Sequence, residues 1–111
     1  MYIWRAPSVA DQPSIELVRW QILETQAGQF HFIGHDVRND WGRASTAIRE
    51  FDRTTLKGVT SSGRHYQLRG EPGTDRDALY VWSVWSVANG IPVAKDVSLE
   101  VLAGEKLCGS R

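Results

Sequence analysis

The three histidines are the side chains of this chain best suited to metal binding or proton transfer. His31 and His35 lie four residues apart in a stretch whose alternating aromatic residues indicate a strand, and His65 lies much farther along. Residues four apart on a strand are separated by about 13 Å. That separation is too large for two ligands of one ion, because a Zn–N bond is about 2.1 Å long. We therefore expect no metal site.

The potential nucleophiles lie where catalysis is not expected. Ser61 and Ser62 come just before His65, but together with Gly63 they are typical of a hairpin turn rather than of a catalytic triad. Cys108 is the only cysteine, so it cannot form an internal disulfide. The sequence also shows neither a phosphate-binding loop nor a Gly-x-Ser-x-Gly turn. These features favour a non-enzymatic protein without a cofactor.

The overall composition is that of one soluble globular domain. The chain has 111 residues, of which 41% are hydrophobic and 23% charged, and its formal net charge is zero. Its apolar runs are far shorter than the roughly 20 residues that span a bilayer. The first residues also lack the apolar stretch of a secretory signal. We therefore expect a cytoplasmic protein with no membrane partner.

Basic and acidic residues are unevenly distributed. Residues 36–70 hold seven Lys and Arg against four Asp and Glu, whereas residues 71–105 hold two against six. A basic sheet face with aromatic residues could bind an anion or a nucleic acid. The candidate residues for binding an anion or a nucleic acid are Trp41, Arg43, Arg64, His65 and Arg69. Since such charges usually form a solvated face with cross-strand pairs, we keep anion binding as the alternative and do not favour nucleic acid.

Alternating apolar residues and short turns predict five consecutive strands. They cover residues 15–24, 29–35, 43–51, 55–60 and 64–69. The first has Val18, Trp20 and Ile22 on one face, and the second has Phe30 and Phe32 on one face. Strands joined in this way form an antiparallel meander.

A helix is predicted over residues 74–89, after a break rich in glycine and proline. Thr74 and Asp77 have the spacing of a capping box. Gly90 suits the left-handed residue that ends a helix, and Pro92 prevents its continuation.

The final element is predicted as a strand over residues 96–102, in which Val97, Leu99 and Val101 alternate with polar residues. The predicted fold is therefore α+β. It consists of a curved antiparallel sheet, with a meander of about five strands and a returning strand, and one helix packed on it. A small open barrel is the close alternative.

The predicted helix is more apolar than one sheet requires. Ala78, Val81, Trp82, Trp85 and Ala88 form a stripe that should face the sheet, and Tyr80, Val84 and Val87 form a second stripe beside it. Either the sheet curls around the helix and buries both, or a second copy covers Tyr80, Val84 and Val87. We expect a binding or interaction module that forms a homodimer. A further alternative is a small apolar molecule bound in a pocket lined by Trp82 and Trp85.

The predicted domain covers residues 15–103. Residues 1–14 contain two prolines and no periodic pattern, so they are expected to form an irregular arm. Residues 104–111, which include Cys108, are expected to form a loose tail.

Part of the sequence resembles small uncharacterised bacterial proteins, which occur as separate genes and among mobile integron gene cassettes. The similar residues are SGRHYQLRGEPG over 62–73, Asp75, Asp77, Ala78 and YVWSVW over 80–85, with weaker similarity back to Trp20 and through Gly42 and Arg43. The resemblance covers about two-thirds of the chain. It implies a free-standing single-domain protein in the cytoplasm and no particular activity, so it assigns no functional residue.

Overall fold

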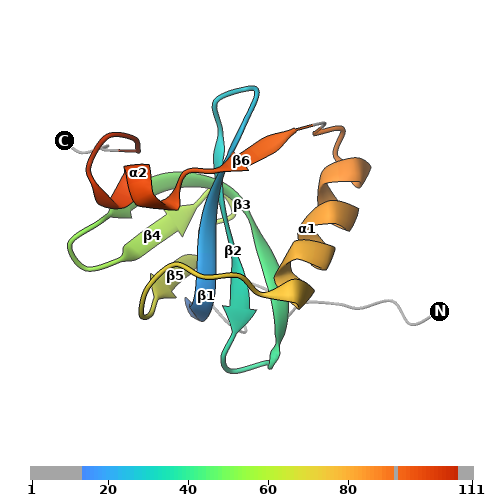
Figure 1. The fold of residues 1–111 in the computed structure, drawn as a ribbon. Coiled ribbons are helices and arrows are strands. Elements are labelled where there is room, and N and C mark those ends of the chain that lie inside the picture. Colours follow the sequence, from blue (N-terminus) through green and yellow to red (C-terminus); the bar gives the residue numbers. More distant parts are fainter. Residues whose placement is uncertain (1–13, 92, 108–111) are drawn as a thin grey trace.

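Five strands follow one another along the chain, and a helix, a sixth strand and a short second helix follow them (Figure 1). The computed structural model describes residues 14–91 and 93–107. The elements are β1 (Ser14–Thr25), β2 (Phe30–Asp36), β3 (Trp41–Asp52), β4 (Lys57–Thr60), β5 (His65–Leu68), α1 (Arg76–Ala88), β6 (Ala94–Asp96) and α2 (Ser98–Leu102). The first five strands and α1 lie within two residues of their predicted ends.

Strands β1 to β5 close into a small barrel. The sheet order is β2-β3-β4-β5-β1-β6, and β1 also pairs with β2. All neighbouring pairs are antiparallel except β1 with β5. This exception follows from the odd number of strands, because the first and fifth strands of a meander run in the same direction. The predicted α+β class is confirmed, in its barrel form, whereas the parallel closing pair was not predicted.

The barrel interior is the main hydrophobic core. Its buried residues are Ile15, Leu17, Trp20, Ile22, Phe32, Ile48, Phe51, Tyr66, Leu68, Val97 and Val101. The Phe32 ring lies against the rings of Phe51 and Tyr66, with centroids 5.7 and 5.2 Å away. Burial of one large apolar side chain contributes about 1.5–3 kcal/mol, so these residues account for most of the driving force for closure.

A β-bulge at Arg19 changes which side chains of β1 point into the barrel. Arg19 has a φ of 46°, and the register with β2 shifts at this point. Before the bulge Leu17 is buried in the core, and after it Trp20 and Ile22 are. The predicted shared face is therefore wrong at Val18, which is only half-buried. The extra residue of a bulge reverses the alternation, and the sequence carries no sign of it.

The predicted strand over residues 96–102 is wrong. The returning strand is the shorter β6, which pairs with the second half of β1, and the residues after it form helix α2. Val97 and Val101 are four residues apart, so one helical face places both in the core. Leu99 is 72% exposed. Alternation in so short a segment does not separate the two periods.

Asp75 caps the start of α1. Its Oδ2 accepts a hydrogen bond from the backbone N–H of Ala78 at 3.0 Å. The predicted capping box of Thr74 and Asp77 is therefore wrong, because Thr74 lies one residue before the cap. At the other end Gly90 has a φ of 69°, which confirms the predicted left-handed residue.

Contacts with the barrel continue past the predicted boundary at residue 103. Lys106 Nζ lies 2.9 Å from Glu24 Oε1, and Leu107 packs against the core. The predicted arm, except Ser14 in β1, and Cys108 lie outside the described residues. In the described part of the chain, no helix has both the length and the apolar character needed to cross a membrane.

We expect Gly42→Ala to lower the free energy of unfolding by about 1–3 kcal/mol. A Cβ at Gly42, in β3, would overlap the backbone of Asp77 and Ala78 in the first turn of α1. Since backbone cannot rotate away as a side chain can, the helix would have to shift. Urea denaturation followed by circular dichroism measures the change.

Gly73→Ala is the matched control. Its added Cβ would lie 3.3 Å from Arg19 Cα, so a much smaller shift is needed than at Gly42. Equal effects of the two substitutions would contradict the close approach of α1 to Gly42.

Candidate functional site

Helix α1 lies on the outside of the barrel, against β2 and β3 (Figure 1). Beneath it is a small second apolar cluster formed by Leu23, Ile33 and Ala78, with Ala44, Trp82 and Ala94 partly buried against it. Of the helix residues only Ala78 and Ser86 are buried. The predicted sheet-facing stripe is wrong at Ala88, which is exposed because the contact with the barrel is limited. The helix is therefore attached to the barrel through a narrow strip of its surface.

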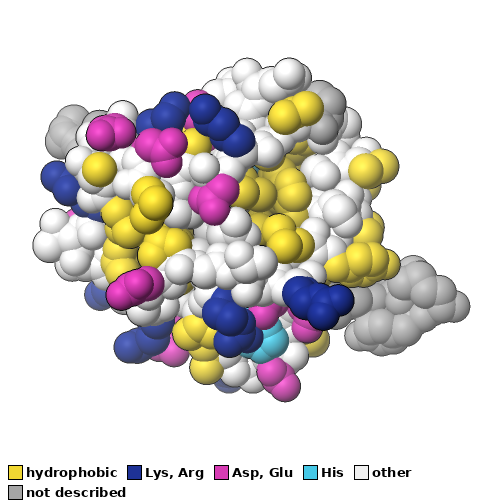
Figure 2. All heavy atoms as spheres, viewed as in Figure 1, with side chains coloured by type: hydrophobic (Ala, Val, Ile, Leu, Met, Phe, Trp, Pro, Cys, Tyr) yellow, Lys and Arg dark blue, Asp and Glu magenta, His cyan; other side chains and the backbone are white. Residues whose placement is uncertain are grey.

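The opposite side of α1 is apolar and exposed. The exposed fractions are 70% for Tyr80, 53% for Val84 and 80% for Val87. On a helix of 3.6 residues per turn, Tyr80 and Val87 point away from the side that carries Ala78. Figure 2 shows hydrophobic side chains along the outer edge of this helix. The second stripe expected from the sequence therefore lies outside the core of the single chain. We call Tyr80, Val84 and Val87 the outer stripe.

A shallow hollow of about 500 Å³ lies beside the C-terminal half of α1. It is lined by Trp82, Ser83, Ser86, Val87, Gly90 and Ile91. The lining holds no charged side chain, so the hollow suits an apolar or aromatic group. Because Val87 belongs both to the outer stripe and to the hollow, the two form one continuous surface.

His31 is buried beneath the two tryptophans of α1. The Trp82 and Trp85 rings each lie 5.2 Å from its ring and 5.4 Å from each other, measured between centroids. His31 Nδ1 lies 2.9 Å from the Ser45 carbonyl oxygen, which only accepts, so Nδ1 carries the hydrogen. Burial lowers the pKa of His31, and the Ser45 bond opposes this less strongly. Burial thus favours the neutral ring, whose Nε2 is an acceptor that no described group bonds.

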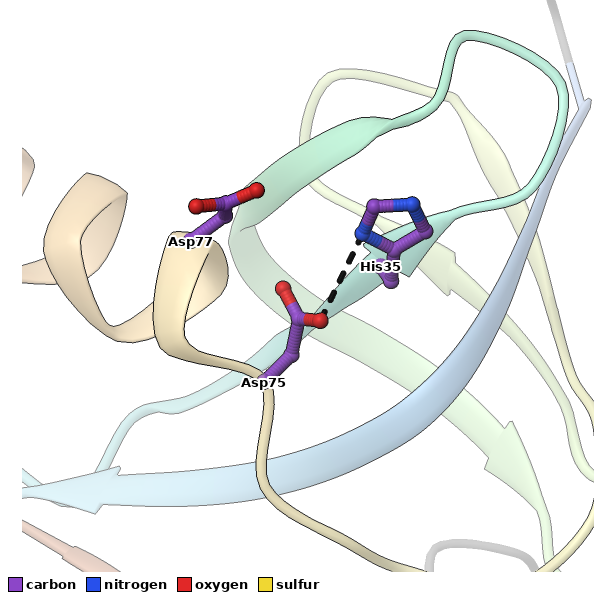
Figure 3. A group of neighbouring side chains, drawn as sticks. All are labelled: His35, Asp75 and Asp77. Carbon is purple, nitrogen blue, oxygen red and sulfur yellow. Dashed lines mark ion pairs between the residues drawn. The ribbon is translucent and has the colours of Figure 1, made fainter.

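A polar cluster lies at the start of α1. His35 in β2 has its Nε2 2.8 Å from Asp40 Oδ1. Its Nδ1 lies 3.4 Å from Asp75 Oδ1 (Figure 3). Arg19 Nε also donates to Asp75 Oδ1, at 3.0 Å. Asp77 approaches the same point, with ligand atoms of His35, Asp75 and Asp77 all within 4.8 Å of one another. One imidazole thus lies between two carboxylates, and one carboxylate between an imidazole and a guanidinium.

The three residues His35, Asp75 and Asp77 have the donor atoms of a metal site. Asp75, however, already uses both of its oxygens, one for Arg19 and one for the helix cap. Burial raises the pKa of Asp75, but the hydrogen bonds from Ala78 and Arg19 and the charge interactions with His35 and Arg19 together hold it below its usual range. A cation would have to displace Arg19, so the cluster is better explained as the fastening of α1 to the barrel.

The candidate cations of the basic sheet face do not all reach the surface. Arg43 is 3% exposed and lies 3.4 Å from both Asp36 Oδ2 and Tyr66 Oη. Arg64 is buried as well. A β-bulge in β3 near Ala44 reverses which side chains of this strand face the barrel interior. Arg43 points inward as a result.

The other members of that set lie at the surface. Arg69 forms an ion pair with Glu16, with Nη2 2.7 Å from Oε2. His65 is exposed and Trp41 is half-buried at the start of β3. Trp82 and Trp85 do come together, as a stacked pair.

The sequence reading missed the contacts that fasten α1. His31 and His35 were correctly placed on the face of β2 opposite Phe32, which is the face that α1 covers. Nothing in the sequence, however, links Arg19 with Asp75, because they are 56 residues apart. The alternation of His31 and His35 with the core residue Phe32 was the only sequence signal for the contacts between β2 and α1.

Comparisons with protein-family models, with curated proteins and with solved structures found no match to this chain. The similarity to integron-cassette proteins therefore stays a prediction, and the site is interpreted from its own geometry.

We expect His31 to make the fold less stable in mild acid. The pKa of His31 in the folded state lies below the unfolded value of about 6.5. The contribution of the neutral ring to the free energy of unfolding is therefore complete above that pH and is lost as the pH falls below it. The slope from one such proton is at most about 1.4 kcal/mol per pH unit. Urea denaturation between pH 7.5 and 5 measures it.

His31→Gln is the comparison, because it keeps an N–H donor for Ser45 and does not titrate. Its unfolding free energy should fall less steeply with acid than that of the natural chain. Equal slopes would show that His31 does not carry this dependence.

We expect Zn²⁺ not to raise the melting temperature of the natural chain, because the Asp75 oxygen that would bind the ion already accepts a hydrogen bond from Arg19. Thermal denaturation with and without excess Zn²⁺ measures this. A Zn²⁺-dependent rise that His35→Ala abolishes would instead identify the polar cluster as a metal site.

Proposed function

We propose that this chain is a non-enzymatic interaction module that binds a second copy of itself through the exposed face of α1. The observation that carries the proposal is the outer stripe, three large apolar side chains that are more than half exposed on an element with few buried residues. A soluble domain usually covers such a surface with a partner.

The absence of charge in this part of α1 supports an apolar partner. From Ala78 to Asn89 the sequence contains no Asp, Glu, Lys or Arg. The cores of protein interfaces are depleted of charged residues and enriched in aromatic ones, and Tyr80 is such a residue. A homodimer needs only this one surface, because both copies contribute the same patch.

Anion binding has weaker support from the geometry. Arg43 is buried against Asp36, and Arg69 is paired with Glu16. Both cations therefore already have partners within the chain. A nucleic acid would compete with these pairs, and we do not propose one.

The small apolar ligand considered from the sequence also has less support. Trp82 and Trp85 pack on His31 and on each other, which leaves no space between the rings for a ligand. The hollow beside them is shallow and merges with the outer stripe at Val87. We therefore assign the hollow to the same interaction surface.

A non-enzymatic role is consistent with the polar cluster at the start of α1. His35 and Asp75 have the residue types of acid–base catalysis, but their partners are one another, Asp40, Arg19 and the helix cap. Groups that satisfy each other in this way hold structure together.

Light scattering on a sizing column tests the proposal. We expect a mass of about 25 kDa, twice the 12.5 kDa of the chain, at high protein concentration and in both low and high salt. The double variant Tyr80→Glu/Val84→Glu should elute as a folded monomer, because it places two carboxylates in the apolar surface.

Leu99→Glu is the matched control. Leu99 is as exposed as Tyr80 but lies on α2, so this charge should leave the dimer intact. A natural chain that is monomeric at every concentration would overturn the proposal.

A further inference from the structure

The outer face of α1 is self-complementary when two copies run antiparallel. If the two-fold axis passes between Ser83 and Val84, each residue faces the partner residue that lies equally far from the axis in the opposite direction along the sequence. Tyr80 of each copy then faces the partner's Val87. The four outward positions Arg76, Tyr80, Ser83 and Val87 follow the spacing i, i+4, i+7, i+11, which keeps them on one side of a helix.

In this arrangement the Tyr80 ring of each copy needs space beside the partner's Val87, and the hollow lies there. Tyr80 is the largest exposed side chain of α1, and Val87, which faces it across the axis, lines the hollow. The hollow exceeds the volume of a phenol ring, since sites for far larger ligands measure about 300–1,000 Å³. Its lining includes the aromatic residue Trp82, a favourable neighbour for an incoming ring. Ser83 at the centre is small and permits close approach of the two helices.

The helix ends also complement one another. The last turn of α1 contains no basic residue to balance the partial negative charge of its carbonyl groups. Arg76, which is exposed in the first turn, would lie beside the partner's last turn in the antiparallel arrangement. In a parallel arrangement Arg76 would instead lie beside the partner's Arg76, where like charges repel.

Resting on the proposed function, we infer that two copies pair α1 antiparallel and that Tyr80 of each copy inserts into the partner's hollow. The helix is about 20 Å long, so the interface is small. We therefore expect an association that reverses on dilution, and the tests use a concentration series extending to several hundred micromolar.

Disulfide trapping tests the pairing. Every variant carries Cys108→Ser, so that only the introduced cysteines react. Tyr80→Cys and Val87→Cys are prepared as two separate proteins. In the inferred arrangement equivalent residues are about 10 Å apart along the helix, beyond the reach of a disulfide, so neither protein should crosslink alone.

An equimolar mixture of the two proteins should crosslink. The thiol introduced at position 80 of one copy would face the thiol introduced at position 87 of the other, and the second Tyr80–Val87 contact stays natural. Mild oxidation and non-reducing electrophoresis give the yield. Crosslinking of each protein alone would show parallel pairing and overturn the inference. A natural dimer whose mixture does not crosslink would overturn the inference and leave the proposed function standing.

The inserted ring is tested by Tyr80→Ala and Tyr80→Phe. Alanine removes the ring and should weaken dimerisation at least tenfold, whereas phenylalanine should stay within about threefold of the natural chain. Circular dichroism checks that both variants fold. Equal affinities of all three proteins would show that Tyr80 does not enter the hollow.

Discussion

The β-bulge at Arg19 is the constraint on which the rest of the structure depends. It reverses the alternation of β1, so that Leu17 before it and Trp20 after it both face the barrel interior. It also turns Arg19 outward to Asp75, the residue that caps α1. The Trp20 carbonyl accepts a hydrogen bond from the backbone N–H of Gly73, which lies in the loop that leads from β5 to α1. One irregular residue thus sets both the core and the position of the helix.

Local patterns were sufficient to predict most of the secondary structure. The first five strands and α1 follow from alternation and helical spacing, and Gly63 and Gly90 have the positive φ that their turns require. Features that depend on pairing between distant segments were not predictable. Bulges in β1 and β3 reverse the alternation. Val97 at the cap of α2 and Val101 within it are four residues apart, a spacing that would also place them on one face of a strand.

The candidate site shows the same division. Tyr80, Val84 and Val87 could be recognised from the sequence as a second apolar stripe, although whether the sheet buries that stripe depends on the tertiary structure. The role of Arg43 could not, since its inward position depends on the register of β3. Sequence patterns predict surfaces that belong to one element. Ion pairs across the fold require the register of every strand between the partners.

The parallel pairing of β1 with β5 also has a consequence for folding. Ser14 pairs with His65, so the barrel cannot close until roughly 50 further residues have been synthesised. The hairpin of β2 with β3 can form earlier, while one side of β1 still has no partner. An unpaired strand edge is a template for pairing with other chains, so residues 14–17 of β1 stay open to aggregation until β5 has been synthesised.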